Sequence, residues 1–185
     1  WVIIDFPDTF AKVGPALVRT GKWDAKKTFF TEAMYDEAVI KTIGVDIMAG
    51  AKGTAAKSIG VSADKWKADR KAAKPSTKET FVDASGFDAT VLLCLAAIHG
   101  KSVKSTSLVK SLRAVSGSQG GTNIPWTKMT DAVKAAAAGK KFTYQGAWTT
   151  AKFDAAGDTS GALFRVYSIS ADGKLSSIDS EDVRF

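Results

Sequence analysis

Short apolar runs alternate with amphipathic stretches along the first third of the chain. The apolar runs lie at residues 1–6, 27–31 and 47–54. Between them, residues 8–21 and 36–43 carry apolar side chains at the three- and four-residue spacing of a helix face. Alternation of strands and helices at such short intervals is typical of parallel sheets. We therefore predict an α/β fold, a three-layer arrangement of a sheet with flanking helices.

Proline within the first predicted helix conflicts with this pattern. Gly14 and Pro15 fall in the middle of residues 8–21. Because proline lacks a backbone N–H, it costs about 3 kcal/mol inside a helix. The helix is therefore predicted either to kink there or to begin at Pro15.

The middle of the chain is predicted to be mostly helical, and the end to be a β-hairpin. The most apolar helix covers residues 84–99, and the glycine- and serine-rich residues 116–123 are interpreted as a loop. Leu163 to Ile169 alternates with the period of a strand, and Asp172-Gly173 is a strong hairpin turn before 174–178. The other predicted helices lie at 62–73, 105–115 and 127–138.

Composition restricts the function classes. Hydrophobic residues make up 45% of the 185 residues and charged residues 24%, which is the usual globular mix and excludes disordered and fibrous classes. A single cysteine, Cys94, excludes an internal disulfide and a cysteine-rich zinc site. We interpret Cys94 as a buried apolar residue and His99, the single histidine, as a helix cap or surface residue. No metal or other cofactor is predicted.

The net charge of +7 is concentrated in one segment. Lys52 to Lys78 holds eight basic residues against Asp64 and Asp69. A nucleic-acid footprint would combine such a segment with exposed aromatic side chains, and Trp66 is the only candidate. We therefore interpret this segment as a solvated basic helix face and predict no nucleic-acid partner.

Motifs for nucleotide binding and covalent catalysis are incomplete. The glycine-rich residues 117–121 lack the lysine and serine or threonine that complete a phosphate-binding loop. Ser85-Gly86 lacks the flanking glycines of a nucleophile elbow. The chain is therefore predicted not to be an enzyme.

Polar residues follow the first two predicted strands. In open α/β sheets, ligands bind outside the carboxyl ends of the strands. Asp5 and Phe6 follow the first strand, and Glu32 follows the second. A carboxylate there can hold an ammonium group, and an aromatic ring can cover apolar or cationic parts of a ligand. The alternative is that Asp5 is a turn residue and Glu32 is solvated.

Four stretches together resemble one family. Residues 87–93 (FDATVLL) resemble the YDAV-LL helix of type I periplasmic solute-binding proteins, the leucine/isoleucine/valine-binding family of ABC transporters. Residues 65–75 resemble that family's preceding helix, with Arg70 standing where a second aromatic residue is expected. Residues 139–147 (GKKFTYQGA) and 153–158 (FDAAGD) are similar to its GKDIDYQGASGPVDFDENGD segment.

The resemblance covers only the C-terminal half of such a protein and implies two lobes that close on a solute. It divides the chain into a second-lobe α/β segment (1–61), a crossover with first-lobe helices (62–125) and a return to the second lobe with the C-terminal hairpin (126–185). One compact domain is the alternative. The implied ligand-binding positions are Asp5, Phe6, Glu32, Phe81 and Asp83. Family members hold the ligand's carboxylate mainly through the early first-lobe segment, so this chain is expected to hold at most half a site.

The function implied is that of an extracytoplasmic substrate-binding protein, periplasmic or extracellular and either free or anchored as a lipoprotein. Its solute would be an amino acid of the branched-chain type or a similar small polar molecule, delivered to a membrane permease. As a C-terminal fragment, the chain is expected to pair with the missing N-terminal half or a second copy, or to rearrange into a single domain. A ligand-sensing receptor domain of the same fold is the first alternative. An α/β enzyme using Asp5, Glu32 or Asp83 is the second.

Overall fold

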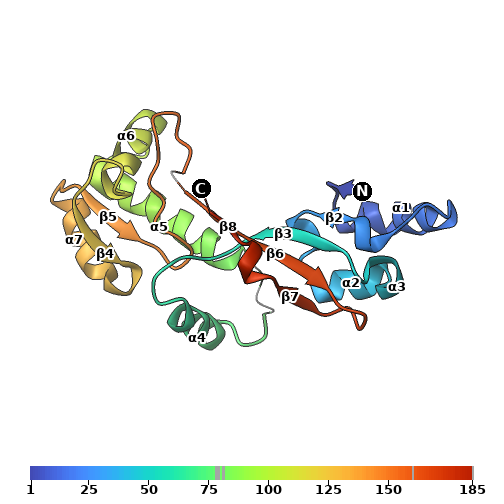
Figure 1. Ribbon diagram of the computed structural model, residues 1–185. Coiled ribbons are helices and arrows are strands. Elements are labelled where there is room, and N and C mark those ends of the chain that lie inside the picture. Colours follow the sequence, from blue (N-terminus) through green and yellow to red (C-terminus); the bar gives the residue numbers. More distant parts are fainter. Residues whose placement is uncertain (78–79, 81, 160, 185) are drawn as a thin grey trace. The chain divides into compact units, whose positions relative to one another are not determined.

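The computed structural model describes residues 1–77, 80, 82–159 and 161–184, and it divides into two compact units (Figure 1). Unit 1 consists of Trp1–Lys57 and Ala162–Phe185, and unit 2 consists of Ser58–Gly161. The return to the first unit thus comes at Ala162, whereas the sequence interpretation placed it at 126. The difference arises because Trp126, Phe142 and Tyr144 pack into the hydrophobic core of unit 2.

Unit 1 is built on a six-stranded mixed sheet. Strands β1, β2 and β3 are parallel neighbours, β3 pairs antiparallel with β6, and both β7 and β8 pair antiparallel with β6. The strands and helices of unit 1 are β1 (Val2–Ile3), α1 (Pro7–Arg19), η1 (Ala25–Lys27), β2 (Phe29–Phe30), η2 (Glu32–Met34), α2 (Glu37–Ile43), α3 (Val45–Met48), β3 (Lys52–Ala56), β6 (Leu163–Ile169), β7 (Leu175–Ser177), η4 (Asp179–Glu181) and β8 (Val183–Arg184).

The predicted third strand is partly wrong. Residues 45–48 form the one-turn helix α3, and the strand covers Lys52–Ala56. Gly44, with φ +126°, and Gly50, with φ +91°, adopt backbone conformations that L side chains rarely take, so the chain turns on either side of α3. The first helix does not begin at Pro15, because α1 runs from Pro7 to Arg19.

Aromatic side chains fill the core of unit 1. Phe10 from α1 lies edge-on to Phe30 from β2, with ring centroids 5.2 Å apart, and both side chains are fully buried. The indole N–H of Trp23 donates to the carbonyl of Ile47 at 2.8 Å. These contacts join α1, α3 and the sheet, so the apolar face predicted for the first helix does pack inward.

The predicted C-terminal hairpin is confirmed. Strands β6 and β7 are antiparallel, with Tyr167 opposite Ser177 and Ile169 opposite Leu175. Gly173 in the connecting turn has φ +76°, a conformation that glycine adopts without a steric penalty.

Unit 2 packs helices around a two-stranded parallel sheet, β4–β5. This sheet was not predicted, because the sequence Thr-Asn-Ile-Pro of β4 has only one large apolar side chain and the preceding glycines favour a loop. The elements of unit 2 are α4 (Ala63–Ala73), α5 (Asp83–Gly100), α6 (Ser105–Val115), β4 (Thr122–Pro125), η3 (Trp126–Lys128), α7 (Met129–Ala137) and β5 (Phe142–Gln145).

A buried carboxylate connects two of the stretches that carry the family resemblance. Asp88 on α5 is 5% exposed and accepts the hydroxyl of Tyr144 and the backbone N–H of Ala147, Trp148 and Thr149, at 2.7–3.3 Å. Burial raises the pKa of the Asp88 carboxyl, while the three N–H groups oppose that rise. A side chain at Gly146 would collide with this carboxylate. Asp88 therefore fixes the loop that follows β5.

Two sequence interpretations in α5 need correction. Cys94 is exposed, not buried, because it lies on the side of α5 that faces away from Leu92 and Leu95 in the core. His99 is half-buried, and its side chain does not cap the helix. Both ring nitrogens are shielded from solvent and have no hydrogen-bond partner among the described residues.

Across the described residues, no helix is by itself long and apolar enough to span a membrane. Only α5 and α6 taken together pass that test, by length and composition alone, and they are bent by 106° at their junction.

Candidate functional site

The parallel strands of unit 1 bring three of the predicted site residues to one edge of the sheet. Val2 pairs with Phe29 and Ile3 with Phe30, so β1 and β2 end side by side. Asp5 and Phe6 lie two and three residues beyond the end of β1, and Glu32 opens η2 just after β2. We call this edge, with Asp5, Phe6 and Glu32, the strand-end site.

The three side chains are available to different degrees. Phe6 is 74% exposed and Glu32 is exposed, whereas Asp5 is half-buried and accepts the backbone N–H of Phe6 at 2.8 Å. Asp5 thus shapes the turn into α1, as the alternative interpretation expected of it. Glu32 and Phe6 keep an open carboxylate and an open aromatic face.

An aromatic and cationic cluster lies beside Glu32, and the sequence interpretation missed it. Tyr35 follows η2, and its ring is 5.0 Å from the ring of Tyr167 on β6. The Tyr167 hydroxyl donates to the carbonyl of Thr31 at 3.1 Å, and the Arg165 guanidinium donates to the Tyr35 hydroxyl at 2.7 Å. Burial, with the charge of Glu32 contributing, raises the pKa of Tyr167 well above its ordinary value. The alternation of residues 163–169 marks Arg165 and Tyr167 as one face of a strand, but only pairing with β3 places them here.

Gly53 makes room for this cluster. Gly53 on β3 pairs with Phe30 on one side and Tyr167 on the other. A Cβ atom at position 53 would overlap the Tyr167 ring and lie 2.7 Å from the Phe30 carbonyl oxygen. The ring of Tyr167 can therefore cross β3 toward Thr31 only over a glycine.

An ion pair occupies the carboxyl end of β3. Lys57 follows β3, and its ammonium group lies 2.6 Å from Asp182 and 3.0 Å from Asp179. The hydrogen bond to Lys57 holds the pKa of Asp182 below its ordinary value, and the same bond raises the pKa of Lys57. Lys57 thereby ties the segment around β8 to the sheet.

Acidification is expected to release this segment. Because the pKa of Asp182 is lowered in the folded state, the ion pair stabilises the fold fully above the ordinary value of 3.8 and less as the pH falls through the lowered pKa. NMR spectra recorded from pH 6 to pH 2 should show the Val183 amide losing its folded chemical shift below pH 3.8. In Lys57→Gln that pH-dependent step should be absent, and an unchanged step in this variant would contradict the assignment.

The remaining predicted residues, Phe81 and Asp83, belong to the sequence of unit 2. Phe81 lies outside the described residues. Asp83 begins α5, accepts the backbone N–H and hydroxyl of Thr80, and pairs with Arg70 at 2.7 Å. The hydrogen bond from the Thr80 hydroxyl, with Arg70 contributing, lowers the pKa of Asp83. Asp83 is thus already bonded to Thr80, just before its own helix, and to Arg70 on α4. Arg70 is the residue that stands where the family pattern has an aromatic side chain.

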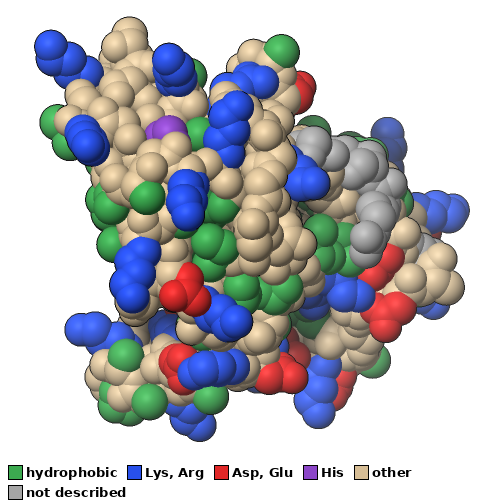
Figure 2. Space-filling view, turned by 90° about the vertical axis from the view of Figure 1, so that its left-hand side faces the viewer, with side chains coloured by type: hydrophobic (Ala, Val, Ile, Leu, Met, Phe, Trp, Pro, Cys, Tyr) green, Lys and Arg blue, Asp and Glu red, His purple; other side chains and the backbone are tan. Residues whose placement is uncertain are grey.

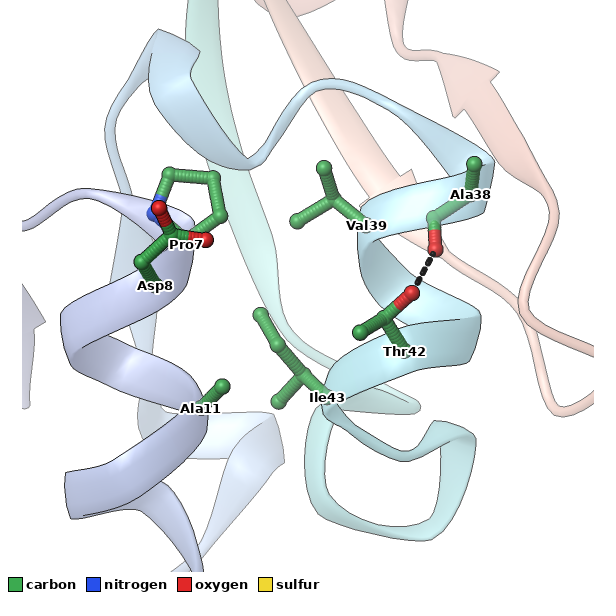
Figure 3. Close-up of a pocket in the computed structure, with 7 residues that line it drawn as sticks. All are labelled: Pro7, Asp8, Ala11, Ala38, Val39, Thr42 and Ile43. Carbon is green, nitrogen blue, oxygen red and sulfur yellow. Dashed lines mark hydrogen bonds between the residues drawn. The ribbon is translucent and has the colours of Figure 1, made fainter.

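A shallow slot of about 210 Å³ lies between α1 and α2, beginning directly after Phe6 (Figure 3). Val39 and Ile43 point from α2 toward Ala11 on α1, and Asp8 stands at its rim. The Thr42 hydroxyl is turned back to the carbonyl of Ala38 at 2.9 Å. The slot is therefore mainly apolar and adjoins the strand-end site along the chain.

The two units differ sharply in charge. Unit 2 holds 15 of the 26 lysines and arginines but 8 of the 19 acids, giving +7, while unit 1 holds 11 of each. In the view of Figure 2, lysine and arginine side chains are spread over the surface rather than gathered in one patch. Trp66 is buried against Phe87, so the basic helix α4 has no aromatic side chain exposed for stacking on bases. This arrangement supports the interpretation of a solvated basic face.

Among the described residues, no group of three or more His, Cys, Asp or Glu side chains is placed so that it could hold a metal ion.

Comparison with known proteins detects similarity at the level of the structure but not at the level of the sequence. The sequence matches no family model and no curated protein. Its structure is similar to the leucine-binding protein LivK from Thermotoga maritima, with a TM-score of 0.63, 15% identity, and coverage of 95% of this chain and 42% of that one. It is also similar to the branched-chain amino acid transporter substrate-binding protein LivJ from Streptococcus pneumoniae, solved with isoleucine. There the TM-score is 0.62, the identity 15%, and the coverage 100% of this chain and 44% of that one.

The chain has the fold of these binding proteins. The predicted incomplete type I periplasmic-binding-protein fold is therefore confirmed. Both neighbours are named as binding proteins. The chain spans less than half the length of either neighbour.

Proposed function

We propose that the chain is the C-terminal part of an extracytoplasmic substrate-binding protein that delivers a branched-chain or similar small amino acid to an ABC transporter permease. The protein would act in the periplasm or outside the cell, free or held by a lipid anchor. The strand-end site would supply this chain's share of the binding site. What supports the proposal most is the combination of this fold with an open carboxylate and an open aromatic face at the carboxyl ends of parallel strands.

In this proposal Glu32 binds the ammonium group of the amino acid. Glu32 is exposed, and no described residue pairs with it in an ion pair of 4 Å or less. Charge-assisted hydrogen bonds between ammonium and carboxylate are about twice as strong as neutral ones. Phe6 would pack on the solute's side chain. Asp83, which is already bonded to Arg70, would act by positioning the start of α5.

The test is calorimetric titration of the gene product that carries these residues with leucine, isoleucine and valine. 4-Methylpentanoate, which lacks the ammonium group, should bind far more weakly than leucine. Glu32→Gln should weaken leucine binding about 10- to 100-fold, the cost of losing a charged hydrogen bond. Asp131→Asn, which removes an exposed carboxylate from the first turn of α7, is the matched control and should leave affinity unchanged.

Two results would count against the proposal. If Glu32→Gln binds leucine as tightly as the parent protein, Glu32 is not the ammonium ligand. If no amino acid raises the melting temperature, the proposed solute class is wrong, because any ligand selective for the native state must stabilise it.

A further inference from the structure

Arg165 is a half-buried cation that makes no ion pair with the described residues. It lies on β6 opposite Ala55, one residue before the end of β3. Its Nη1 donates to the Tyr35 hydroxyl at 2.7 Å. Its Nε is shielded from solvent and has no hydrogen-bond partner among the described residues. Because a guanidinium group carries two N–H donors on each Nη atom, Nη2 and the second N–H of Nη1 remain available to a further acceptor.

The carboxylate of Asp182 senses Arg165 but is already occupied. The charge of Arg165 contributes to the lowered pKa of Asp182. However, Oδ2 of Asp182 accepts from the Lys57 ammonium at 2.6 Å, and Oδ1 accepts the Val166 N–H at 3.3 Å. Charges removed from water are normally paired with an opposite charge. Arg165 therefore has room for an anion that the described part of the chain does not supply.

Two tyrosines hold the guanidinium group beside the strand-end site. The central carbon of the Arg165 guanidinium lies 5.1 Å from the centre of the Tyr35 ring, in a cation–π contact. Tyr35 packs in turn on Tyr167, with ring centroids 5.0 Å apart. The Tyr167 hydroxyl donates to the carbonyl of Thr31, the residue that precedes Glu32. The guanidinium group is therefore preorganised close to Glu32, which lowers the entropy cost of binding a ligand there.

An apolar group, an anion and a cation follow one another along this edge of the sheet. The strand order β1-β2-β3-β6 places Phe6 beyond β1, Glu32 beyond β2 and Arg165 on β6 beside the end of β3. The two charges are not paired with each other at 4 Å or less. An apolar amino acid carries the three complementary groups, a side chain, an ammonium group and a carboxylate. With the ammonium group on Glu32 and the side chain on Phe6, the carboxylate is directed to the side of Arg165.

We propose that Arg165 binds the carboxylate of the solute and that Tyr35 positions Arg165 for this contact. Hydrogen bonds between arginine and a carboxylate are charge-assisted and often bidentate, here through Nη1 and Nη2. The inference rests on the proposed function, because it takes the solute to be the amino acid that Glu32 binds. It departs from the family resemblance, which assigned the carboxylate mainly to an early segment of the first lobe. Unit 1 then supplies a partner for each of the three groups of the solute.

The test compares leucine with leucinamide, which keeps the ammonium group and the side chain but has a neutral amide in place of the carboxylate. Both are titrated calorimetrically into the gene product that carries these residues. The parent protein should bind leucine at least about 10-fold more tightly than leucinamide. In Arg165→Met, leucine affinity should fall about 10-fold or more, while leucinamide affinity should change less than about 3-fold. Arg19→Met is the matched control and should change neither affinity, because Arg19 is exposed in the last turn of α1, at the opposite end of that helix from Phe6.

Tyr35→Phe tests the positioning role with a smaller change. This variant keeps the ring beneath the guanidinium group and removes the hydroxyl that accepts from Nη1. Leucine affinity should fall about 3- to 10-fold, and leucinamide affinity should stay the same. A tyrosine that served only the packing of unit 1 would instead change both affinities together.

The outcomes separate this inference from the proposed function. Glu32→Gln should weaken leucine and leucinamide alike, because both carry the ammonium group. If Glu32→Gln has that effect but Arg165→Met binds leucine as tightly as the parent protein, the proposed function stands and the inference is overturned. Equal losses for the two ligands in both Arg165→Met and Tyr35→Phe would overturn it as well. A gene product that binds neither ligand refutes the inference and the proposed function together.

Discussion

Replacing Asp88 with asparagine is expected to destabilise unit 2 by about 3 kcal/mol or more. Both carboxylate oxygens accept backbone N–H groups, Oδ1 from Ala147 and Oδ2 from Trp148 and Thr149. An asparagine turns one of these oxygens into an NH₂ group, so at least one buried N–H then faces a donor. Each buried donor left without an acceptor costs about 1–3 kcal/mol, and the bonds lost are charge-assisted.

Urea denaturation followed by tryptophan fluorescence measures this effect, because the buried Trp66 and Trp126 both lie in unit 2. Tyr144→Phe removes one of the four bonds to Asp88 and should cost only about 1 kcal/mol. Asp131→Asn, an exposed acid-to-amide change in the same unit, should stay within about 0.5 kcal/mol of the parent chain. A cost for Asp88→Asn no larger than that of Tyr144→Phe would show that Asp88 does not hold the loop.

Gly53→Ala is expected to disrupt the sheet of unit 1 beside the strand-end site. The new methyl group would overlap the Tyr167 ring and approach the Phe30 carbonyl oxygen to 2.7 Å, so either the ring or the strands must move. Overpacking of this kind costs about 1–3 kcal/mol, and here both neighbours of the new methyl group belong to paired strands. We expect a loss near the upper end of that range.

Hydrogen exchange of peptides from β3 and β6 measures this effect, because exchange in both strands of unit 1 should be faster in Gly53→Ala than in the parent chain. The matched control is Gly86→Ala, because Gly86 lies within α5 and a Cβ there meets no atom within 4 Å. That control should be neutral or stabilise the chain by about 0.5–1 kcal/mol, as alanine is the better helix former. If exchange in β3 is as slow in Gly53→Ala as in the parent chain, the crossing of Tyr167 over β3 does not depend on glycine.

Much of the fold could be predicted from the sequence, because the helices have strong periodicity and their ends carry recognisable residues. Asp36 caps α2 by accepting the Ala38 N–H, and Gly173 closes the predicted hairpin. The strands β4 and β5 were not predicted. β4 has one large apolar side chain and follows two glycines, and β5 is only four residues long, although its Phe142 and Tyr144 are buried in the core of unit 2. Cys94 was misjudged for a related reason. Periodicity identifies an apolar helix but cannot say which side another element covers.

The placement of three candidate residues at one end of the sheet could be predicted from the sequence, but the residues beside them could not. The rule that ligands bind at the carboxyl ends of parallel strands singled out Asp5, Phe6 and Glu32, and the strand register places all three at one edge. Tyr35, Arg165 and Tyr167 could not be added, because β6 reaches β3 only through a pairing between residues more than 100 positions apart. The sequence marked Asp83 as a ligand-binding residue but could not show its ion pair with Arg70, because that pair depends on how α4 folds.

The discontinuity of unit 1 bears on how the chain folds as it leaves the ribosome. Unit 2 is one uninterrupted stretch and can complete its core while translation continues, whereas β3 must wait for β6 to be synthesised. Contacts this distant in sequence are slow to form, because a long loop must close before any of them is gained. During that interval the edge of β3 that later pairs with β6 is unpaired, and unpaired strand edges favour aggregation.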